Sequence, residues 1–194
     1  SPRMLHPLQE ARKRHVPIIT FNPLRERGLA RFVNPQSPSE MLGPQSTVIS
    51  TQYHQVKIGG DLAAVTGIIK ALLAMEQAAL EQGLPGVLDH AFIEAHTEGF
   101  AALCREVQGY DWDLLERHSG IGRAAMEAAA TVYARTNNVM IVYGMGMTQH
   151  RHGVDNVQML VNLLLLRGNI GKPGAGICPV RGHSNVQGQR TVGI

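Results

Sequence analysis

Two short apolar runs, separated by long segments of helical period, constrain this sequence more than any other feature. Residues 16–21 and 139–143 are rich in apolar and β-branched residues and predict buried strands. Residues 61–81 carry Leu, Val and Ile at helical spacing and predict a long helix between the two runs. Because parallel strands need such crossover connections, this order favours an α/β domain with a Rossmann-like parallel sheet flanked by helices.

Helix starts, breaks and turns complete the expected order of elements. Asp61 is a good N-cap for the long helix, which we expect to end near Gly83. Further helices are expected over residues 4–15, 89–107 (broken at Gly99), 123–135 and 153–167, with additional starts at Asp111 and Ser119. Extended structure is expected over residues 47–58, and loops over residues 34–46 and from Gly168 onward.

The composition fits a single domain, residues 1–194, with a substantial core. Of the 194 residues, 44% are hydrophobic but only 5% are aromatic, which favours packed α/β layers over an all-β sandwich. The net charge of +3 is small, and no basic stripe with interleaved aromatics is present, so nucleic-acid binding is disfavoured. No run reaches about 18 consecutive apolar residues, and we expect no membrane contact from this segment.

The cysteines and histidines show no metal or nucleophile signature. Cys104 and Cys178 lie far apart and form no iron–sulfur spacing, so we expect no disulfide framework and a reducing, cytoplasmic location. The nine histidines include His150 and His152, but they match no zinc motif, and we expect surface or core roles and no metal ligand. The chain begins without Met, and we interpret it as a piece of a longer protein.

The first candidate site follows the second predicted strand, at Gly144-Met145-Gly146-Met147-Thr148-Gln149. In open α/β sheets, ligands bind beyond the carboxyl ends of the strands. Gly144 and Gly146 would let the backbone approach a ligand closely, while Thr148 and Gln149 add side-chain donors and acceptors. A plain strand-to-helix turn explains Gly144, Met145 and Gly146 equally well.

Two other segments could bind an anion or a nucleoside. Gly171, Gly174 and Gly176 could form backbone N–H nests for an anion, although a helix C-cap followed by a flexible linker is the alternative. Polar residues also follow the ends of extended segments, at Asn22, Arg25, Gly60 and Asp61. A carboxylate at such a position often contacts a ribose or guanine edge, while a simple helix cap remains the alternative for Asp61.

The last candidate segment is residues 179–188. Arg181 offers a planar fork for a carboxylate or phosphate, and Asn185 and Gln187 offer mixed donors and acceptors for the edge of a heterocycle. A polar surface loop is the alternative. Glycines flank the polar residues at Gly182 and Gly188.

Taken together, the segments 144–149, 168–176 and 179–188, in this order and spacing, resemble the molybdopterin oxidoreductase (DMSO reductase) family. The pattern is most similar to the formate dehydrogenase α-subunit. Residues 97–100 and 22–26 agree with it, as do Gly60 and Asp61 before the long helix.

The resemblance implies a bis(molybdopterin guanine dinucleotide) cofactor that holds molybdenum or tungsten, and a domain that binds one of its two dinucleotides. It places Asn22, Arg25 and Asp61 at the guanosine end and residues 144–149 along the phosphate or pterin. Residues 168–194 are implied to form a Gly-rich cofactor and active-site loop. Its implied pterin contacts are Asn185 and Gln187, with Gly171, Gly174, Gly176, Gly182 and Gly188 as cofactor-binding glycines.

The implied catalytic residues are Arg181, which would orient a substrate carboxylate beside the metal, and His183. His183 departs from the Gln that formate dehydrogenases are expected to carry, which puts formate in doubt as the substrate. The metal-ligating residue and the 4Fe–4S cysteines are expected outside this chain, in the remaining domains of the parent. The resemblance implies a small-molecule substrate but does not identify the electron acceptor. We expect the fragment alone to be inactive.

A non-catalytic nucleotide-binding α/β module is the alternative to an oxidoreductase fragment. It would use Gly144 and Gly146 in a mononucleotide turn and Arg181 as a phosphate clamp. The linked Gly-rich segments downstream argue against it, because a simple nucleotide module has no need of them.

Overall fold

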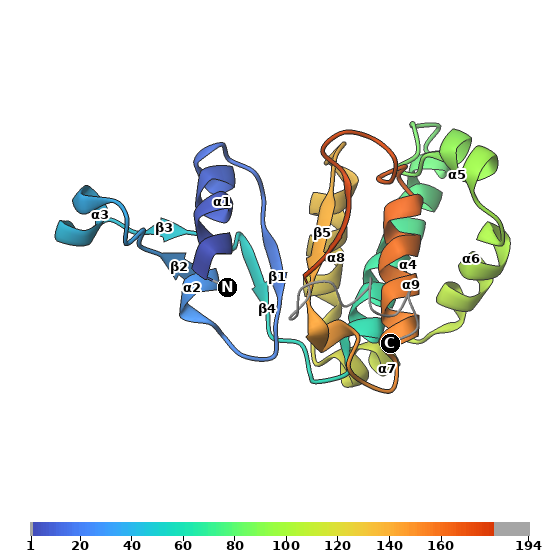
Figure 1. The fold of residues 1–194 in the computed structure, drawn as a ribbon. Helices are drawn as coiled ribbons and strands as arrows, with labels where there is room; N and C mark the ends of the chain where they lie inside the picture. Colours follow the sequence, from blue (N-terminus) through green and yellow to red (C-terminus); the bar gives the residue numbers. More distant parts are fainter. Residues whose placement is uncertain (1, 181–194) are drawn as a thin grey trace, which may run out of the picture.

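The structure is a computed structural model that describes residues 2–180, and Figure 1 shows its mixed α/β arrangement. In chain order the elements are α1 (Pro2–Lys13), β1 (Ile19–Phe21), α2 (Arg27–Ala30), β2 (Arg31–Phe32), α3 (Pro38–Leu42), β3 (Thr47–Val48), β4 (Gln52–His54), α4 (Asp61–Glu81), α5 (His90–His96), α6 (Phe100–Gly109), α7 (Trp112–Ser119), α8 (Arg123–Ala134), β5 (Met140–Tyr143), the 3-10 helix η1 (Met145–Met147), α9 (Gly153–Leu165) and β6 (Gly176–Pro179).

The principal strands pair in parallel, as the sequence predicts. β1 pairs with β4 in parallel, and β5 pairs with β6 in parallel, while β2 and β3 form an antiparallel ribbon. The Rossmann-like class of parallel strands flanked by helices is therefore confirmed. Within residues 2–180, however, the strands form three separate two-stranded sheets instead of one continuous sheet.

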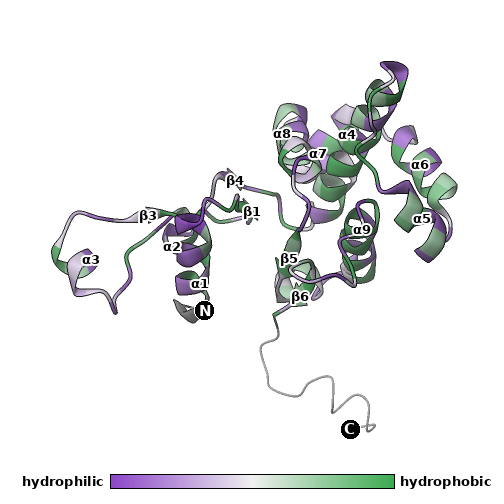
Figure 2. Ribbon diagram, turned by 90° about the horizontal axis from the view of Figure 1, so that it is seen from above, coloured by the Kyte–Doolittle hydropathy of each residue, from purple (hydrophilic) through white to green (hydrophobic). Residues whose placement is uncertain are grey.

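The four parallel strands run in the same direction, so their carboxyl ends and the turns that follow lie at one end of the molecule (bottom of Figure 1). We call this end, made of residues 22–26, 55–61 and 144–152, the carboxyl edge. Elements α1–α3 and β1–β4 lie to one side, and α4–α9 with β5 and β6 lie to the other, as Figure 2 shows from above. Ligands of open α/β folds bind at such an edge.

Helix α4 is the centre of the core and packs against α6, α7, α8 and α9. Its fully buried Ile69 and Leu72 lie in the stripe that helical periodicity predicts, and each such side chain stabilises the fold by about 1.5–3 kcal/mol. Gly67 lets Met126 of α8 approach closely, because a Cβ at Gly67 would overlap the Met126 sulfur. By length and composition α4 could also cross a membrane, and half of that apolar stretch is buried inside the domain.

Several predicted strands and loops differ in the structure. The first strand spans only Ile19–Phe21 and is half-buried, and β5 is exposed at Met140 and Val142 because one face of its sheet is uncovered in the described part of the chain. The predicted loop 34–46 contains the short helix α3, and the predicted loop after Gly168 contains the strand β6.

The helix termini correct two of the predictions. Gly60, and not Asp61, is the N-cap of α4, and Asp61 is its first helical residue. Ser119 ends α7 and does not start a helix, because Gly120 follows in the left-handed conformation that terminates a helix. The predicted break at Gly99 is confirmed, with φ of 78°.

Candidate functional site

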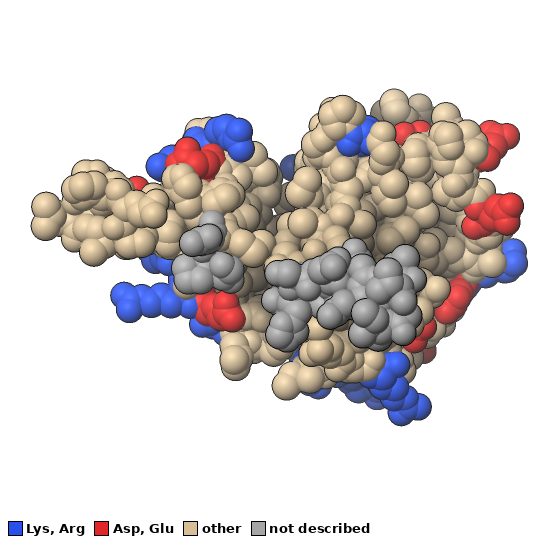
Figure 3. All heavy atoms as spheres, in the orientation of Figure 1, with Lys and Arg blue, Asp and Glu red and all other residues tan. Residues whose placement is uncertain are grey.

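The carboxyl edge brings together three of the segments that the sequence singles out. The turns after β1, β4 and β5 all lie there (Figure 1). Figure 3 shows acidic side chains on the side of α5 and α6, and basic side chains both at the end near α7 and on the side of α1 to α3. The exposed basic residues on or beside the carboxyl edge are Arg25, Lys57, Arg117 and Arg151. This arrangement favours an anionic ligand at the carboxyl edge.

The turn after β1 is shaped by Asn22 and Tyr53. The Asn22 amide Nδ2 donates to the Leu24 carbonyl at 2.6 Å, and the Tyr53 hydroxyl donates to the same carbonyl at 2.7 Å. The Tyr53 hydroxyl also accepts from the backbone N–H of Glu26 at 2.9 Å. These bonds leave Arg25 exposed on the turn. The sequence analysis missed Tyr53, whose hydroxyl holds this turn from the neighbouring strand.

Asp61 lies half-buried at the start of α4. Burial raises the pKa of its carboxyl, and its own backbone N–H and the facing His150 ring partly offset this shift. A carboxylate that has lost water in this way gains from a hydrogen-bond donor on a ligand. Gly60 has a packing role instead, because a Cβ there would lie 2.5 Å from the His118 carbonyl oxygen.

The turn after β5 is built by a single 3-10 turn. The N–H groups of Thr148 and Gln149 both donate to the Met145 carbonyl, at 3.1 and 2.8 Å. A Cβ added at Gly146 would meet no atom within 4 Å, and one at Gly144 would meet only the Val180 carbonyl oxygen, at 3.9 Å. Neither glycine has a positive φ. Internal packing in the described chain therefore does not require glycine here, whereas the close approach of a ligand would.

Two further residues at this turn, Asn156 and His150, were not predicted. Asn156 of α9 is fully buried, and its Nδ2 donates to the Met147 carbonyl at 3.0 Å. The same Nδ2 lies 2.8 Å from Nε2 of His150, which we had assigned a surface or core role. The only sequence signal was an Asn inside the apolar pattern of a helix.

The helices α4 and α9 both begin at the carboxyl edge. Their N-cap residues, Gly60 and His152, form no side-chain capping bond. Backbone N–H groups at such ends, together with the helix dipole, attract phosphate or carboxylate. Each of these first turns already carries one carboxylate, Asp61 in α4 and Asp155 in α9, so the exposed basic side chains are the stronger indication of an anionic ligand.

The second Gly-rich segment lies elsewhere. Gly171 and Gly174 precede β6 and therefore lie at the opposite end of the β5–β6 pair from Gly144, while Gly176 pairs with Met140. All three glycines have positive φ, from 76° to 137°, which accounts for glycine on conformational grounds. The structure does not bring these predicted cofactor-binding residues to the carboxyl edge.

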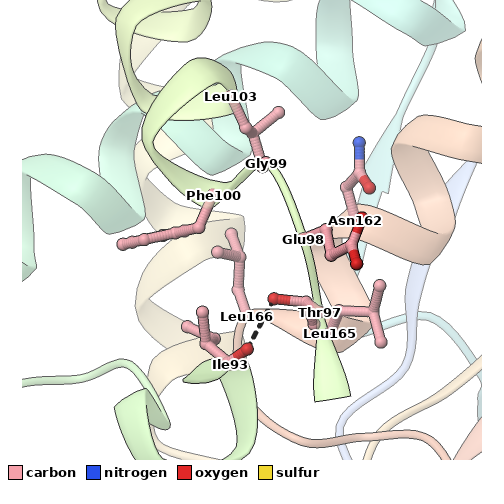
Figure 4. Close-up of a pocket in the computed structure, with 9 residues that line it drawn as sticks. All are labelled: Ile93, Thr97, Glu98, Gly99, Phe100, Leu103, Asn162, Leu165 and Leu166. Atoms are coloured by element: carbon pink, nitrogen blue, oxygen red, sulfur yellow. Dashed lines mark hydrogen bonds between the residues drawn. The ribbon is translucent and has the colours of Figure 1, made fainter. Parts of the chain in front are cut away.

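A hollow of about 130 Å³ also lies away from the carboxyl edge, between α5, α6 and the last turn of α9. Figure 4 shows apolar side chains such as Phe100, Leu103 and Leu166 around it, with Thr97 bonded to the Ile93 carbonyl. Thr97, Glu98 and Asn162 also line it, but its lining includes no basic side chain that could bind a phosphate. We therefore place the candidate site at the carboxyl edge.

Six predicted site residues lie outside the described part of the chain: Arg181, Gly182, His183, Asn185, Gln187 and Gly188. Among residues 2–180, no three His, Cys, Asp or Glu side chains gather in a way that could hold a metal ion. Cys104 and Cys178 are both free.

Comparison with known proteins decides the family. A family model described as molybdopterin oxidoreductase matches residues 21–192. The chain belongs to this family.

Three relatives in the molybdopterin oxidoreductase family illustrate the similarity. Protein YdeP of Escherichia coli (strain K12) is 52% identical over 193 residues, which cover all of this chain and 25% of YdeP. Uncharacterized oxidoreductase Rv2900c of Mycobacterium tuberculosis is 41% identical over 194 residues, or 24% of that protein. Formate dehydrogenase H of Escherichia coli is 40% identical over 125 residues, which cover 64% of this chain and 17% of that protein.

The chain therefore spans about a quarter of the length of its molybdopterin oxidoreductase relatives. Among solved structures, acetylene hydratase from Pelobacter acetylenicus superposes with a TM-score of 0.67 over 88% of this chain and 20% of that protein. At 19% identity this likeness shows the shared fold.

Proposed function

We propose that this chain is the dinucleotide-binding segment of an oxidoreductase that uses bis(molybdopterin guanine dinucleotide), and that the carboxyl edge holds one of the two dinucleotides. The observation that carries the proposal is the open backbone of Gly146 at this edge. The starts of α4 and α9 and the nearby basic side chains support it, because helix N-termini and positive charges stabilise bound phosphate groups.

The residues of the carboxyl edge fit different parts of such a ligand. Asp61 and Asn22 offer an acceptor and an amide to a nucleoside, and Arg25 offers a charged fork to a phosphate. The backbone at Gly144 and Gly146, with Met145, Thr148 and Gln149, would lie along the phosphate or pterin. This assignment places the side chains of Asn22, Arg25 and Asp61 at one end of the ligand and the glycine-containing turn after β5 at the other.

When bound, the cofactor's molybdenum or tungsten supplies a two-electron redox step, while the protein supplies binding and orientation. We propose that Arg181 orients a small substrate carboxylate and that His183 lies beside it. Similarity to formate dehydrogenase H supports formate or another small molecule as the substrate. The other domains of the parent chain, which we place in the cytoplasm, would provide the metal ligand and any 4Fe–4S cluster.

The first test is metal and nucleotide analysis of the full-length parent, purified anaerobically from a host that makes the cofactor. We expect molybdenum or tungsten together with guanine nucleotide released by acid. Folded parent that contains neither would refute the proposal and favour the non-catalytic nucleotide-binding module.

A matched pair of variants tests the position of the ligand. Gly146→Ala adds a methyl group at the carboxyl edge, and Gly109→Ala adds one at the end of α6, and neither Cβ meets another atom within 4 Å. We expect about tenfold weaker cofactor retention in Gly146→Ala only, with unchanged thermal stability in both variants. Equal cofactor retention in the two variants would show that the ligand does not contact this turn.

A further inference from the structure

We propose that Asn156 is a positioning residue for the dinucleotide, acting through the Met147 carbonyl to hold the turn after β5 in its binding shape. This inference rests on the function proposed above. Asn156 itself is fully buried and does not contact the ligand in this scheme. Its contribution is to keep a glycine-containing turn ordered before the ligand arrives.

The turn has few hydrogen bonds of its own. Its 3-10 helix spans only Met145–Met147, with backbone bonds from Met147 to Gly144 and from Thr148 and Gln149 to Met145. Glycine loses more conformational freedom on ordering than any other residue, and this turn contains glycines at positions 144 and 146. Contacts from outside the turn therefore help to select one conformation.

Two contacts from α9 provide that selection. Asn156 Nδ2 donates to the Met147 carbonyl at 3.0 Å, across the end of the 3-10 helix. Gly153 lets the start of α9 lie directly against the Thr148 carbonyl, where a Cβ would overlap it. The first turn of α9 thus touches two successive residues of the loop, and the amide of Asn156 is the only side-chain donor among these contacts.

The burial of Asn156 indicates that its amide serves to position the turn after β5. Its Oδ1 is buried without a hydrogen-bond partner among the described residues, which is unfavourable for a buried polar atom. An apolar side chain of the same size would avoid this cost. The Nδ2 bond to the Met147 carbonyl is the compensating interaction, and it acts on the turn that faces the ligand.

His150 is the second neighbour of the Asn156 amide, but it lies outside the 3-10 helix whose shape is at issue. Its Nε2 lies 2.8 Å from Asn156 Nδ2, and its Nδ1 lies 3.3 Å from the backbone N–H of His152. A neutral imidazole ring carries one proton, so it cannot accept at both nitrogens at once. The ring is also half-exposed, unlike Asn156. We therefore assign the positioning effect to the Met147 carbonyl and not to His150.

The test uses the full-length parent, with guanine nucleotide released per folded protein as the readout. Asn156→Leu keeps the side-chain size and removes the donor, whereas Asn156→Asp keeps the shape but presents only acceptors when ionised. We expect both variants to bind the cofactor about tenfold more weakly, equivalent to about 1.4 kcal/mol at 25 °C. The melting temperature of the cofactor-free protein, measured alongside, separates weaker binding from failure to fold.

One control makes the result specific. Asn162→Leu changes an amide on the same helix but beside the hollow at the opposite end, and we expect full cofactor content.

Each outcome bears on a different claim. Wild-type cofactor content in both Asn156 variants would overturn the positioning role, as would a loss in Asn162→Leu equal to that in Asn156→Leu. If either variant lost cofactor only in proportion to a lower melting temperature, the role would be merely structural and the inference wrong. A wild-type parent that lacks guanine nucleotide would instead refute the proposed function itself.

Discussion

Replacing Glu76 with Gln is expected to loosen the connection between α4 and α5, because this carboxylate holds the intervening loop. Glu76 is 6% exposed, and its Oε2 accepts from the backbone N–H groups of Val87 at 2.5 Å and Leu88 at 2.9 Å. Its Oε1 lies 2.7 Å from Nε2 of His90. Gly86 passes so close that a Cβ there would overlap the carboxylate.

The expected change in the free energy of unfolding follows from the number and kind of these hydrogen bonds. A hydrogen bond to a charged group contributes about 1.5–3 kcal/mol, roughly twice that of a neutral pair. The Gln oxygen can still accept from Val87 and Leu88, but as a neutral acceptor, and the His90 contact must rearrange. We therefore expect Glu76→Gln to lower the free energy of unfolding by about 2–3 kcal/mol. Gly86→Ala, which displaces the carboxylate, should lower it comparably.

The same carboxylate predicts a pH dependence. Burial alone would raise the pKa of Glu76, but hydrogen bonds from His90, Leu88 and Val87 outweigh burial and hold the pKa below its ordinary value. A lowered pKa in the folded state stabilises the protein above the ordinary glutamate pKa of about 4.3. This stabilisation is lost as the pH falls through the folded-state pKa.

Urea unfolding of residues 1–194, followed by circular dichroism at pH 7 and at pH 3–4, measures both effects. Glu81→Gln is the control, since Glu81 lies on the same helix but is exposed and bonds only Gln77 at 2.7 Å. Its effect should stay within about 0.5 kcal/mol. The reasoning fails if Glu76→Gln is equally mild at pH 7, or if its difference from wild type does not shrink in acid.

Two other predictions concern the core and the substrate. Tyr133→Phe removes a hydroxyl that donates to the Leu163 carbonyl at 2.6 Å and accepts from Asn169 at 3.1 Å, and should cost about 1–3 kcal/mol in urea unfolding. Burial raises the pKa of Tyr133 to about 12, so wild type should lose stability between about pH 10 and 12, and equal alkaline loss in Tyr133→Phe would contradict this. Arg181→Ala in the parent should lower kcat/KM for a carboxylate substrate about 10- to 100-fold in steady-state assays, and an unchanged value would exclude Arg181 from substrate binding.

The sequence predicted the elements whose signals are local. The long apolar stripe of α4 and the helix break at Gly99 were confirmed, because periodicity and a positive-φ glycine act within a few residues. The strand β6 was missed because its four residues, which begin with Gly176 and end with Pro179, carry no recognisable period. Its pairing with β5 depends on packing that brings distant residues together.

For the candidate site, the sequence predicted the turns of the carboxyl edge but not what supports them. A glycine pattern does not distinguish a ligand contact at Gly146 from a conformational need at Gly171 or Gly174. The structure shows a conformational need, a positive φ, at Gly171 and Gly174, and only free space around a Cβ at Gly146, where the ligand contact stays a proposal. Tyr53 and Asn156 were missed because their bonds to the turns join residues from other elements.

The carboxyl edge is shared between two groups of elements that otherwise contact mainly themselves. Elements within residues 2–54 pack chiefly on one another, as do those from Asp61 onward, and residues 55–60 join the groups. A dinucleotide that contacts both groups of elements would stabilise the arrangement in which they are held together, because it binds only that arrangement. Lys57 is exposed in the joining segment, so tryptic cleavage after Lys57 should slow as the protein fills with cofactor. Protease resistance would then report how much of the protein has bound cofactor.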